Sequence, residues 1–214
     1  DDTERGDGGF GSTGIWFFFK LGINMINYLN QAKEIFDEII SYRRLIHQNP
    51  ELSFQEFKTT EFICNVLKEN NIEFKRITET GVVALIGKAG KCVALRADID
   101  ALPVIEETNL PFSSQINGVM HACGHDMHTS MLLGAAIILK KHEHLLNGTV
   151  KLIFQPGEEK LPGGAKLMIE AGVLENPKVD AIFGQHIHPQ DETGKIAIAA
   201  GPIMASTDEL YITI

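Results

Sequence analysis

Histidines, a cysteine and an aspartate crowd one short stretch of the sequence. They are His121, Cys123, His125, Asp126 and His128. Thiolate and neutral imidazole are strong ligands for zinc and similar metals. Because only Gly124 separates Cys123 from His125, both side chains can point the same way from a turn. One histidine alone would be explained by solvation or a hydrogen bond, but this density of ligand-type residues predicts a metal site.

Three further groups of ligand-type side chains follow short apolar runs that predict β-strands. They are Asp98 and Asp100 after 92–96, Glu158 and Glu159 after 149–155, and His186 and His188 after 179–184. Ligand sites in open α/β sheets lie at the carboxyl ends of strands. One such group would fit a helix cap or a turn. Together with Cys123 and His125, the three groups predict a single shared metal centre.

The adjacent glutamates indicate a division of labour within that centre. Glu159 would bind metal, whereas Glu158 would accept a proton from a metal-bound water and pass it to a leaving amine. Metal binding lowers the pKa of that water from about 15.7 to about 7, so hydroxide forms at neutral pH. The Cys123 thiolate has lone pairs enough to bridge two cations. Asp98 or Asp100 would orient a ligand histidine through its second ring nitrogen. His121 and His128 each fit either a place in the site or a structural hydrogen bond.

The elements that would position these residues alternate between helical and strand patterns. Helices are predicted over 29–48, from about 53 to 70, over 131–139 and over 165–171. Strands are predicted over 72–77, 82–86, 92–96, 149–155, 179–184, 194–200 and 209–214. Ser53 with Glu56 three residues later is a capping-box signature for the second helix. Cys92 is expected to be a buried strand residue and Cys64 to lie on a helix face, and neither has a ligand-type neighbour.

Composition narrows the class of protein. The 214 residues, 44% hydrophobic and 22% charged, suit a globular α/β protein with a sizeable core. The net charge of -9 argues against nucleic acid and against an anionic membrane as partners. The three cysteines form an odd set in dissimilar settings, which indicates a reducing compartment, so we expect a cytoplasmic protein.

Residues 1–24 differ from the rest of the chain. An acidic, glycine-rich start is followed by the apolar run 14–23, which is too short to span a bilayer. We interpret 1–24 as a tag or non-native leader and Met25 as the native start. A membrane-touching anchor is the alternative interpretation.

Several motifs of the chain resemble those of the N-acyl-amino-acid amidohydrolases. They are the segments 42–53, 96–103, 120–128, 154–159 and 184–189. The group includes hippurate hydrolase, auxin-conjugate hydrolases and N-acetyldiaminopimelate deacetylase, within the aminoacylase/carboxypeptidase-G metallopeptidases. The resemblance implies a zinc-exopeptidase-like catalytic domain, with a mixed central sheet flanked by helices. It also implies two divalent metal ions, zinc or manganese, with nickel and cobalt as alternatives.

Carried over residue by residue, the resemblance assigns roles to six positions. The implied metal ligands are Cys123, His125, Glu159 and His186, the implied general base is Glu158, and the implied supporting aspartate is Asp98. His188 falls where the family varies and receives no role. The implied reaction is metal-dependent hydrolysis of the amide bond of N-acyl amino acids.

The resemblance further implies a division into domains. Residues 25–205 would form an incomplete catalytic domain, and 206–214 would begin a lid domain through which the intact protein forms a homodimer. The family's last histidine ligand would lie further downstream. For these reasons a non-catalytic metal-binding fragment is the first alternative function. A dipeptidase or carboxypeptidase that uses the same site is the second.

Overall fold

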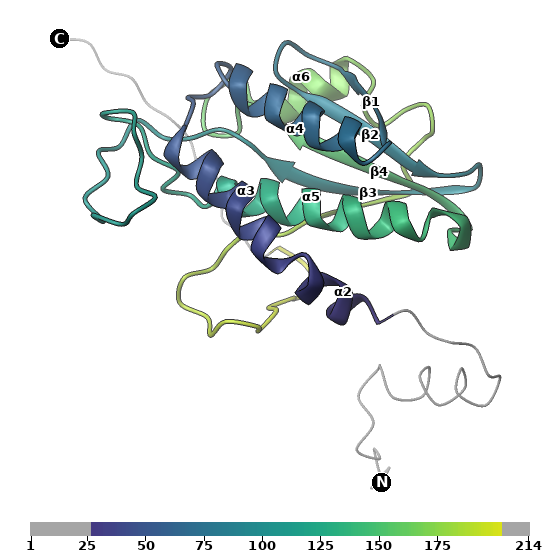
Figure 1. Cartoon of the computed structure of the whole chain (residues 1–214). Coiled ribbons are helices and arrows are strands. Elements are labelled where there is room, and N and C mark those ends of the chain that lie inside the picture. The colour runs from purple at the N-terminus through teal and green to yellow at the C-terminus, as the bar shows by residue number, and fades with distance from the viewer. Residues whose placement is uncertain (1–26, 203–214) are drawn as a thin grey trace, which may run out of the picture.

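The computed structural model describes residues 27–202, in which a mixed sheet forms the centre of the molecule (Figure 1). The strands are β1 (Glu73–Arg76), β2 (Val82–Gly87), β3 (Lys91–Asp98), β4 (Gly148–Gln155) and β5 (Ala181–Gly184). Their order is β1-β2-β4-β3-β5. β2 is antiparallel to β1 and to β4, whereas β3 is parallel to β4 and to β5. The expected mixed sheet is therefore confirmed. The predictions for 1–24 and 206–214, including the strand over 209–214, lie outside the described residues.

Helices flank this sheet, as the resemblance implied. They are α2 (Tyr28–Glu34), α3 (Phe36–Gln48), α4 (Phe57–Glu69), α5 (His125–Lys141) and α6 (Gly164–Glu170), with a 3-10 turn at Glu143–Leu145. The single helix expected over 29–48 is divided at Ile35, which leaves helical geometry with its side chain buried. α5 begins well before the predicted start at Met131. Its first turn escaped the apolar pattern because the buried residues there are polar, namely His125, Asp126 and His128.

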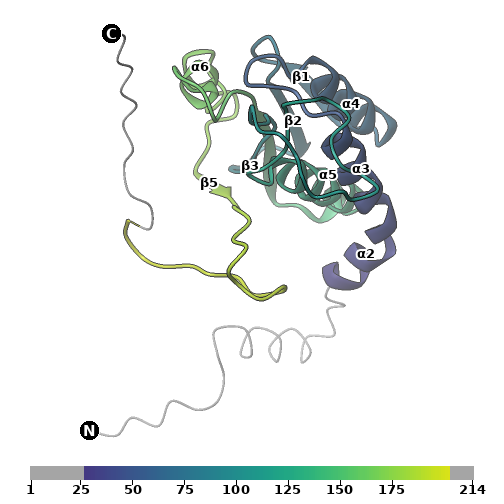
Figure 2. The same ribbon diagram turned by 90° about the vertical axis from the view of Figure 1, so that its left-hand side faces the viewer.

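The two faces of the sheet carry different layers. α4 and α5 pack on one face, and the main core there includes Val82 and Ala84 of β2 with Leu133 of α5. α6 lies on the opposite face (Figure 2), where a smaller core joins Val83 to Met168. The alternation of β2 side chains between these layers follows from the period of two along a strand. Cys92 is buried in β3 and Cys64 lies on α4, as predicted, and Cys64 is buried as well.

The strand predicted over 194–200 is wrong. Those residues carry no strand, and the side chains of Ile196 and Ile198 are 79% and 89% exposed. Apolar and other residues do alternate over 194–200, but such a segment forms a strand only when a neighbouring strand pairs with its backbone. Within the described range 27–202, no neighbouring strand pairs with this segment.

The predicted capping box is also wrong, because both of its side chains bond elsewhere. The Ser53 hydroxyl donates to Asp100 Oδ2 at 2.6 Å instead of capping α4. Glu56 is fully buried and accepts hydrogen bonds from the backbone N–H groups of Phe54 and Gly157 and from the Thr80 hydroxyl. The first turn of α4 is bonded instead by Glu51, whose carboxylate accepts from the N–H groups of Lys58 and Thr59.

Glu56→Ala is expected to destabilise the protein by about 3 kcal/mol, because three donors, two of them in buried hydrogen bonds, would lose their acceptor. Burial also raises the pKa of Glu56, while its hydrogen bonds oppose that rise. Urea unfolding at neutral pH measures the loss. Glu61→Ala, at an exposed position of the same helix, is the control and should change stability by no more than about 0.5 kcal/mol. Equal stabilities for the two variants would contradict the structural role of Glu56.

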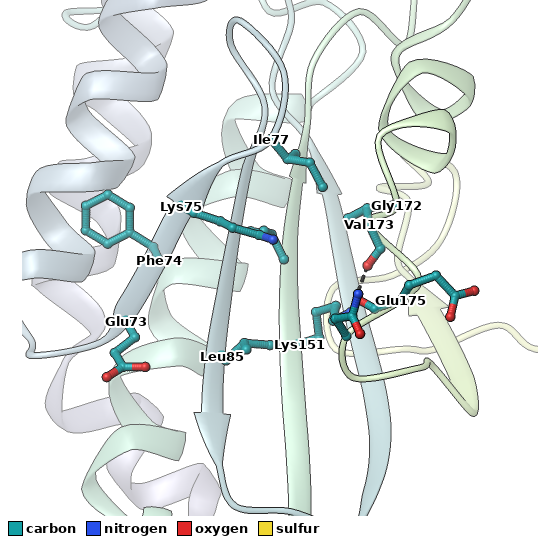
Figure 3. A pocket seen from close by; sticks show the side chains of 11 residues that line it. Glu73, Phe74, Lys75, Ile77, Leu85, Lys151, Gly172, Val173 and Glu175 are labelled. Atoms are coloured by element: carbon teal, nitrogen blue, oxygen red, sulfur yellow. Dashed lines mark hydrogen bonds between the residues drawn. The ribbon is translucent and has the colours of Figure 1, made fainter.

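A pocket of about 200 Å³ lies on the α6 face of the sheet (Figure 3). Beside it, the buried Lys151 of β4 donates to the backbone carbonyls of Val173, Glu175 and Pro177 at 2.8–2.9 Å. These bonds fix the segment that leads from α6 to β5. The lining residues, all within the described part of the chain, include no histidine and no cysteine. This pocket is therefore separate from the predicted metal ligands.

No helix among the described residues combines the length and the hydropathy needed to cross a bilayer.

Candidate metal centre

The turn before α5 places Cys123 and His125 side by side. Gly124 is the N-cap of α5 and has φ +88°, a conformation that glycine adopts without the strain of a side chain. His125, the first residue of the helix, is completely buried, whereas Cys123 is partly exposed. The short Cys-Gly-His spacing thus delivers a thiol and an imidazole from one turn.

His125 has one ring nitrogen engaged and one free to bind a ligand. Its Nδ1 donates to the Asp100 backbone carbonyl at 2.9 Å and lies 3.2 Å from Asp100 Oδ1. Its Nε2 is buried and finds no hydrogen-bond partner among the described residues. Around that nitrogen lie carboxylate oxygens of Asp98 at 3.6 Å, Glu159 at 3.8 Å and Glu158 at 4.0 Å. The sequence left open whether Asp98 or Asp100 orients a ligand histidine. In the structure Asp100 is the carboxylate that orients His125.

His186, in the segment that follows β5, lies close to Cys123 and His125. Its Nε2 lies 3.4 Å from Cys123 Sγ, and its Nδ1 donates to the carbonyl of Ile187 at 2.8 Å. Cys123, His125 and His186 offer ligand atoms within 4.8 Å of one another, and so do His125, Glu158 and Glu159. The four residues predicted as ligands and the predicted general base thus lie in one cluster with His125 at its centre.

Asp98, His125 and His128 form a third group with ligand atoms this close, but both ring nitrogens of His128 are already engaged in hydrogen bonds. His128 Nδ1 donates to Asp98 Oδ1 at 2.5 Å, and His128 Nε2 accepts from the Ile187 N–H at 3.0 Å. His128 therefore makes structural hydrogen bonds that hold the residue next to His186. Asp98 supports His128, and it also pairs with Arg96 Nη1 at 2.9 Å.

Two further histidines, His121 and His188, lie apart from this cluster. His188 is exposed and pairs with Asp191. His121 is buried, neither of its ring nitrogens has a partner among the described residues, and burial lowers its pKa to about 4. It belongs to none of the groups whose ligand atoms converge.

The cluster is strongly acidic, and its pKa shifts reflect that. Burial alone would raise the pKa of Asp98, but the His128 hydrogen bond and the charges of His125 and Arg96 hold it at about 2. Burial, followed by the negative charge of Glu159, raises the pKa of Glu158. Burial and the same carboxylates raise the pKa of the Cys123 thiol to about 12.

Divalent cations fit this arrangement. Their charge would offset the crowded carboxylates and favour the Cys123 thiolate, since a coordinating thiol is deprotonated. The bare His125 Nε2 and the buried, unpartnered Glu159 Oε1 are ligand atoms that the described residues leave unused. A mixture of thiolate, imidazole and carboxylate donors suits zinc and related transition metals.

Sequence reasoning missed a second layer of residues around the cluster. Ser53 donates to Asp100, and Glu56 holds the Gly157 N–H just before the two glutamates. The sequence predicted that Ser53 and Glu56 form a capping box, which is a different role, and the motif 42–53 assigned no contact to Ser53. Arg43 and His47 of α3 hold Asp126, the neighbour of His125, and His47 also bonds Glu106. Arg43 and His47 lie in the motif 42–53 and Asp126 in the motif 120–128, but nothing in either motif indicated that these residues bond one another.

Glu106, which bonds His47, is expected to make the stability of the fold depend on pH. Burial opposes ionisation of Glu106, but hydrogen bonds from the Ser114 N–H, Thr108 and His47 lower its pKa from 4.5 to about 2. A carboxylate with a depressed folded-state pKa stabilises the fold above its unfolded-state pKa and loses that contribution as pH falls. Glu106→Gln is therefore expected to cost on the order of 2 kcal/mol at pH 6, with the difference shrinking as pH falls towards 3. Urea unfolding of both proteins across that range checks this, and a difference that is constant with pH would contradict it.

Comparison with known proteins places the chain in a family. The model of peptidase family M20/M25/M40 matches residues 94–210, more than half of the chain. The chain belongs to the peptidase M20 family. The match covers all five positions predicted for metal binding and the general base.

Two curated proteins are similar to this chain over most of its length. Thermostable carboxypeptidase 2 of Saccharolobus solfataricus is 49% identical over 190 residues, which are 86% of this chain and 48% of that protein. The N-acyl-L-amino acid amidohydrolase of Geobacillus stearothermophilus is 46% identical over 184 residues, 85% of this chain and 49% of that protein. The chain thus spans about half the length of the curated relatives it matches.

A solved M20 structure confirms the fold. A Bacillus subtilis protein described as a dinuclear metal-binding peptidase from the M20 family superposes with a TM-score of 0.70 at 48% identity. The superposition covers 74% of this chain and 45% of the other. The mixed sheet with flanking helices is therefore a fold that this chain shares with a solved member of the M20 family.

Proposed function

We propose that the protein to which this chain belongs hydrolyses the amide bond of N-acyl amino acids with the help of two divalent metal ions. The observation that carries this proposal is the convergence of Cys123, His125, Glu159 and His186 beside Glu158. The family and the relative named as an N-acyl-L-amino acid amidohydrolase support it. The solved relative described as dinuclear supports the number of ions.

Each side chain of the cluster has a distinct part in this proposal. Cys123, His125, Glu159 and His186 would hold the cations, with zinc or manganese favoured and nickel or cobalt as alternatives. When bound, the cations would supply Lewis-acid chemistry, which makes a water molecule acidic enough to act as a nucleophile at neutral pH. Asp100 keeps the His125 ring oriented. Asp98 acts as the supporting aspartate by fixing His128 and, through it, the backbone next to His186.

Glu158 would be the general base. Its side chain is 41% exposed, so water can reach it, and its Oε2 lies 4.0 Å from His125 Nε2. Its raised pKa brings it closer to the pH at which it must take up and release a proton. Glu158 would accept the proton of the attacking water and deliver it to the nitrogen of the scissile amide. The products are a carboxylic acid and a free amino acid.

A carboxypeptidase or dipeptidase activity is the second candidate. The relative named thermostable carboxypeptidase 2 favours it, and the same residues would cleave a peptide bond by the same steps. A third candidate, a metal-binding fragment without turnover, applies to the 214-residue chain by itself. We further propose a catalytic domain over 25–205, a lid domain that begins at 206–214, a homodimer formed through that lid, and a cytoplasmic location.

Release of free amine tests these candidates. The full-length protein, stripped of metal with a chelator, is assayed with zinc, manganese or cobalt on hippurate, N-acetyl amino acids and dipeptides. Metal-dependent turnover of the acylated amino acids supports the proposal. Turnover of dipeptides alone would favour the peptidase. Metal binding without turnover of any of these substrates would leave a non-catalytic protein and overturn the proposed activity.

A further inference from the structure

A buried network outside the cluster connects three segments that are distant in sequence. Arg43 and His47 are one helical turn apart on α3 and therefore lie on the same face of it. Arg43 Nε and His47 Nδ1 both donate to Oδ2 of Asp126, at 2.7 and 2.8 Å. The Asp126 side chain is fully buried, and that of His47 is 4% exposed. This network ties α3 to the first turn of α5.

The same histidine also binds the long loop that precedes the ligand turn. His47 Nε2 lies 3.2 Å from Glu106 Oε1, and the other Glu106 oxygen accepts from the Ser114 N–H at 2.6 Å. Glu106 thus connects two parts of the loop to each other and connects the loop to α3. Farther along, the loop continues directly into His121 and Cys123. With an acceptor carboxylate at each ring nitrogen, His47 is a donor on both sides, which is the bonding of an imidazolium.

The turn that carries Cys123 and His125 has little local support of its own. Its N-cap residue is Gly124, which offers no side chain to bond the first N–H groups of α5. Asp126 is the acidic residue of that first turn, where a negative charge is favoured by the helix dipole. Because its Oδ1 has no partner among the described residues, Asp126 is held through Oδ2, which faces α3.

From this geometry we propose that His47 is a positioning residue of the metal centre. Through Asp126 it fixes the start of α5, and with it the relative placement of Cys123 and His125. This role rests on the proposed function, in which those two residues bind metal. His47 itself lies away from the reacting atoms and acts only through Asp126.

Two conservative variants separate the two bonds of His47. The amide nitrogen of asparagine lies near the position of histidine Nδ1, so His47→Asn keeps a donor for Asp126. The amide nitrogen of glutamine lies near that of Nε2, so His47→Gln keeps a donor for Glu106 and loses the bond to Asp126. His142→Asn is the matched control, because His142 lies at the far end of α5, where it bonds Gln31.

The readouts are cobalt affinity, the thiolate-to-cobalt absorption band, and deuterium uptake of residues 120–126 in the metal-free, full-length protein. We expect His47→Gln to lower cobalt affinity by about tenfold or more, by analogy with other residues that orient metal ligands. It should also shift the absorption band and raise deuterium uptake. His47→Asn should stay within about threefold of the wild type, as should the control. A residue that only stabilised the fold would lower the melting temperature and leave the affinity of the folded protein unchanged.

Affinities and uptake that are the same in wild type, His47→Asn and His47→Gln would overturn the proposal. Equal losses in both variants would overturn the assignment to the Asp126 bond. If His47→Gln does not fold, Asp126→Asn tests the same link, because asparagine keeps the size of the side chain but replaces the charged acceptor of the His47 bond with a weaker, neutral one. Unchanged cobalt affinity and uptake in Asp126→Asn would then overturn it. A wild type that binds no cobalt would overturn the proposed function instead, and deuterium uptake would still decide whether His47 holds the turn.

Discussion

Replacing Glu158 with glutamine is expected to lower the rate of amide hydrolysis by roughly 10²–10⁴-fold, the usual contribution of a general base. Glutamine keeps the size and the hydrogen-bonding capacity of the side chain but takes up no proton. Since the proposed ligands are other residues, the bound metal should be unchanged. The measurement is kcat for release of amine from N-acetyl amino acids by the full-length protein, together with metal content by mass spectrometry.

Glu170→Gln is the control for that experiment. Glu170 is an exposed residue of α6 that faces Lys166, and its loss should leave both turnover and metal content unchanged. If Glu158→Gln turned over substrate at the wild-type rate, Glu158 would lose its role as the base. If the variant lost its metal as well as its activity, Glu158 would instead be a ligand, and the division of labour between the two glutamates would be wrong.

Cys123→Ala is expected to lower the affinity for zinc or cobalt by at least about one hundredfold, more than the loss of an outer residue that merely orients a ligand. The thiolate is the softest donor in the cluster, and Cys123 Sγ lies 3.4 Å from His186 Nε2, so its removal leaves His186 without a neighbouring proposed ligand. The thiolate-to-cobalt absorption band should also vanish. Competition titration with a chromophoric chelator measures the affinity.

Cys64→Ala is the matched control, because Cys64 is a buried cysteine of α4 that belongs to none of the groups whose ligand atoms converge. It should lose some stability through the small cavity that is left, but no metal affinity. Equal affinities in Cys123→Ala and the wild type would show that the thiol is not a ligand. The site would then depend on His125 and the carboxylates.

The cluster could be predicted from the sequence because its members carry unusual chemistry at short spacing. Cys123 and His125 are separated only by a glycine, and Glu158 and Glu159 are adjacent at the end of β4. Ligand sites in open α/β sheets lie at the carboxyl ends of strands, and this rule predicted that the separate groups lie close together. β3 and β4 are parallel, so Asp98 and Gln155 are paired in register, and their following residues lie at the same edge of the sheet.

The bonds within the cluster could not be predicted in the same way. Asp98 and Asp100 are both buried carboxylates after β3, yet Asp98 pairs with His128 and Asp100 with His125. Which aspartate pairs with which histidine depends on how the first turn of α5 is rotated relative to the sheet. The periodicity of the sequence does not predict that rotation. Ser53 illustrates the same limit, because its local pattern favoured a helix cap whereas a carboxylate distant in the chain was the stronger acceptor.

The direct test of the metal centre is anomalous X-ray diffraction from crystals of the full-length protein grown with zinc, measured on both sides of the zinc absorption edge. We expect anomalous peaks within about 2.0–2.3 Å of ligand atoms of Cys123, His125, Glu159 and His186. Zinc bound elsewhere on the protein, with no peak at these four side chains, would contradict the assignment of this cluster as the metal site.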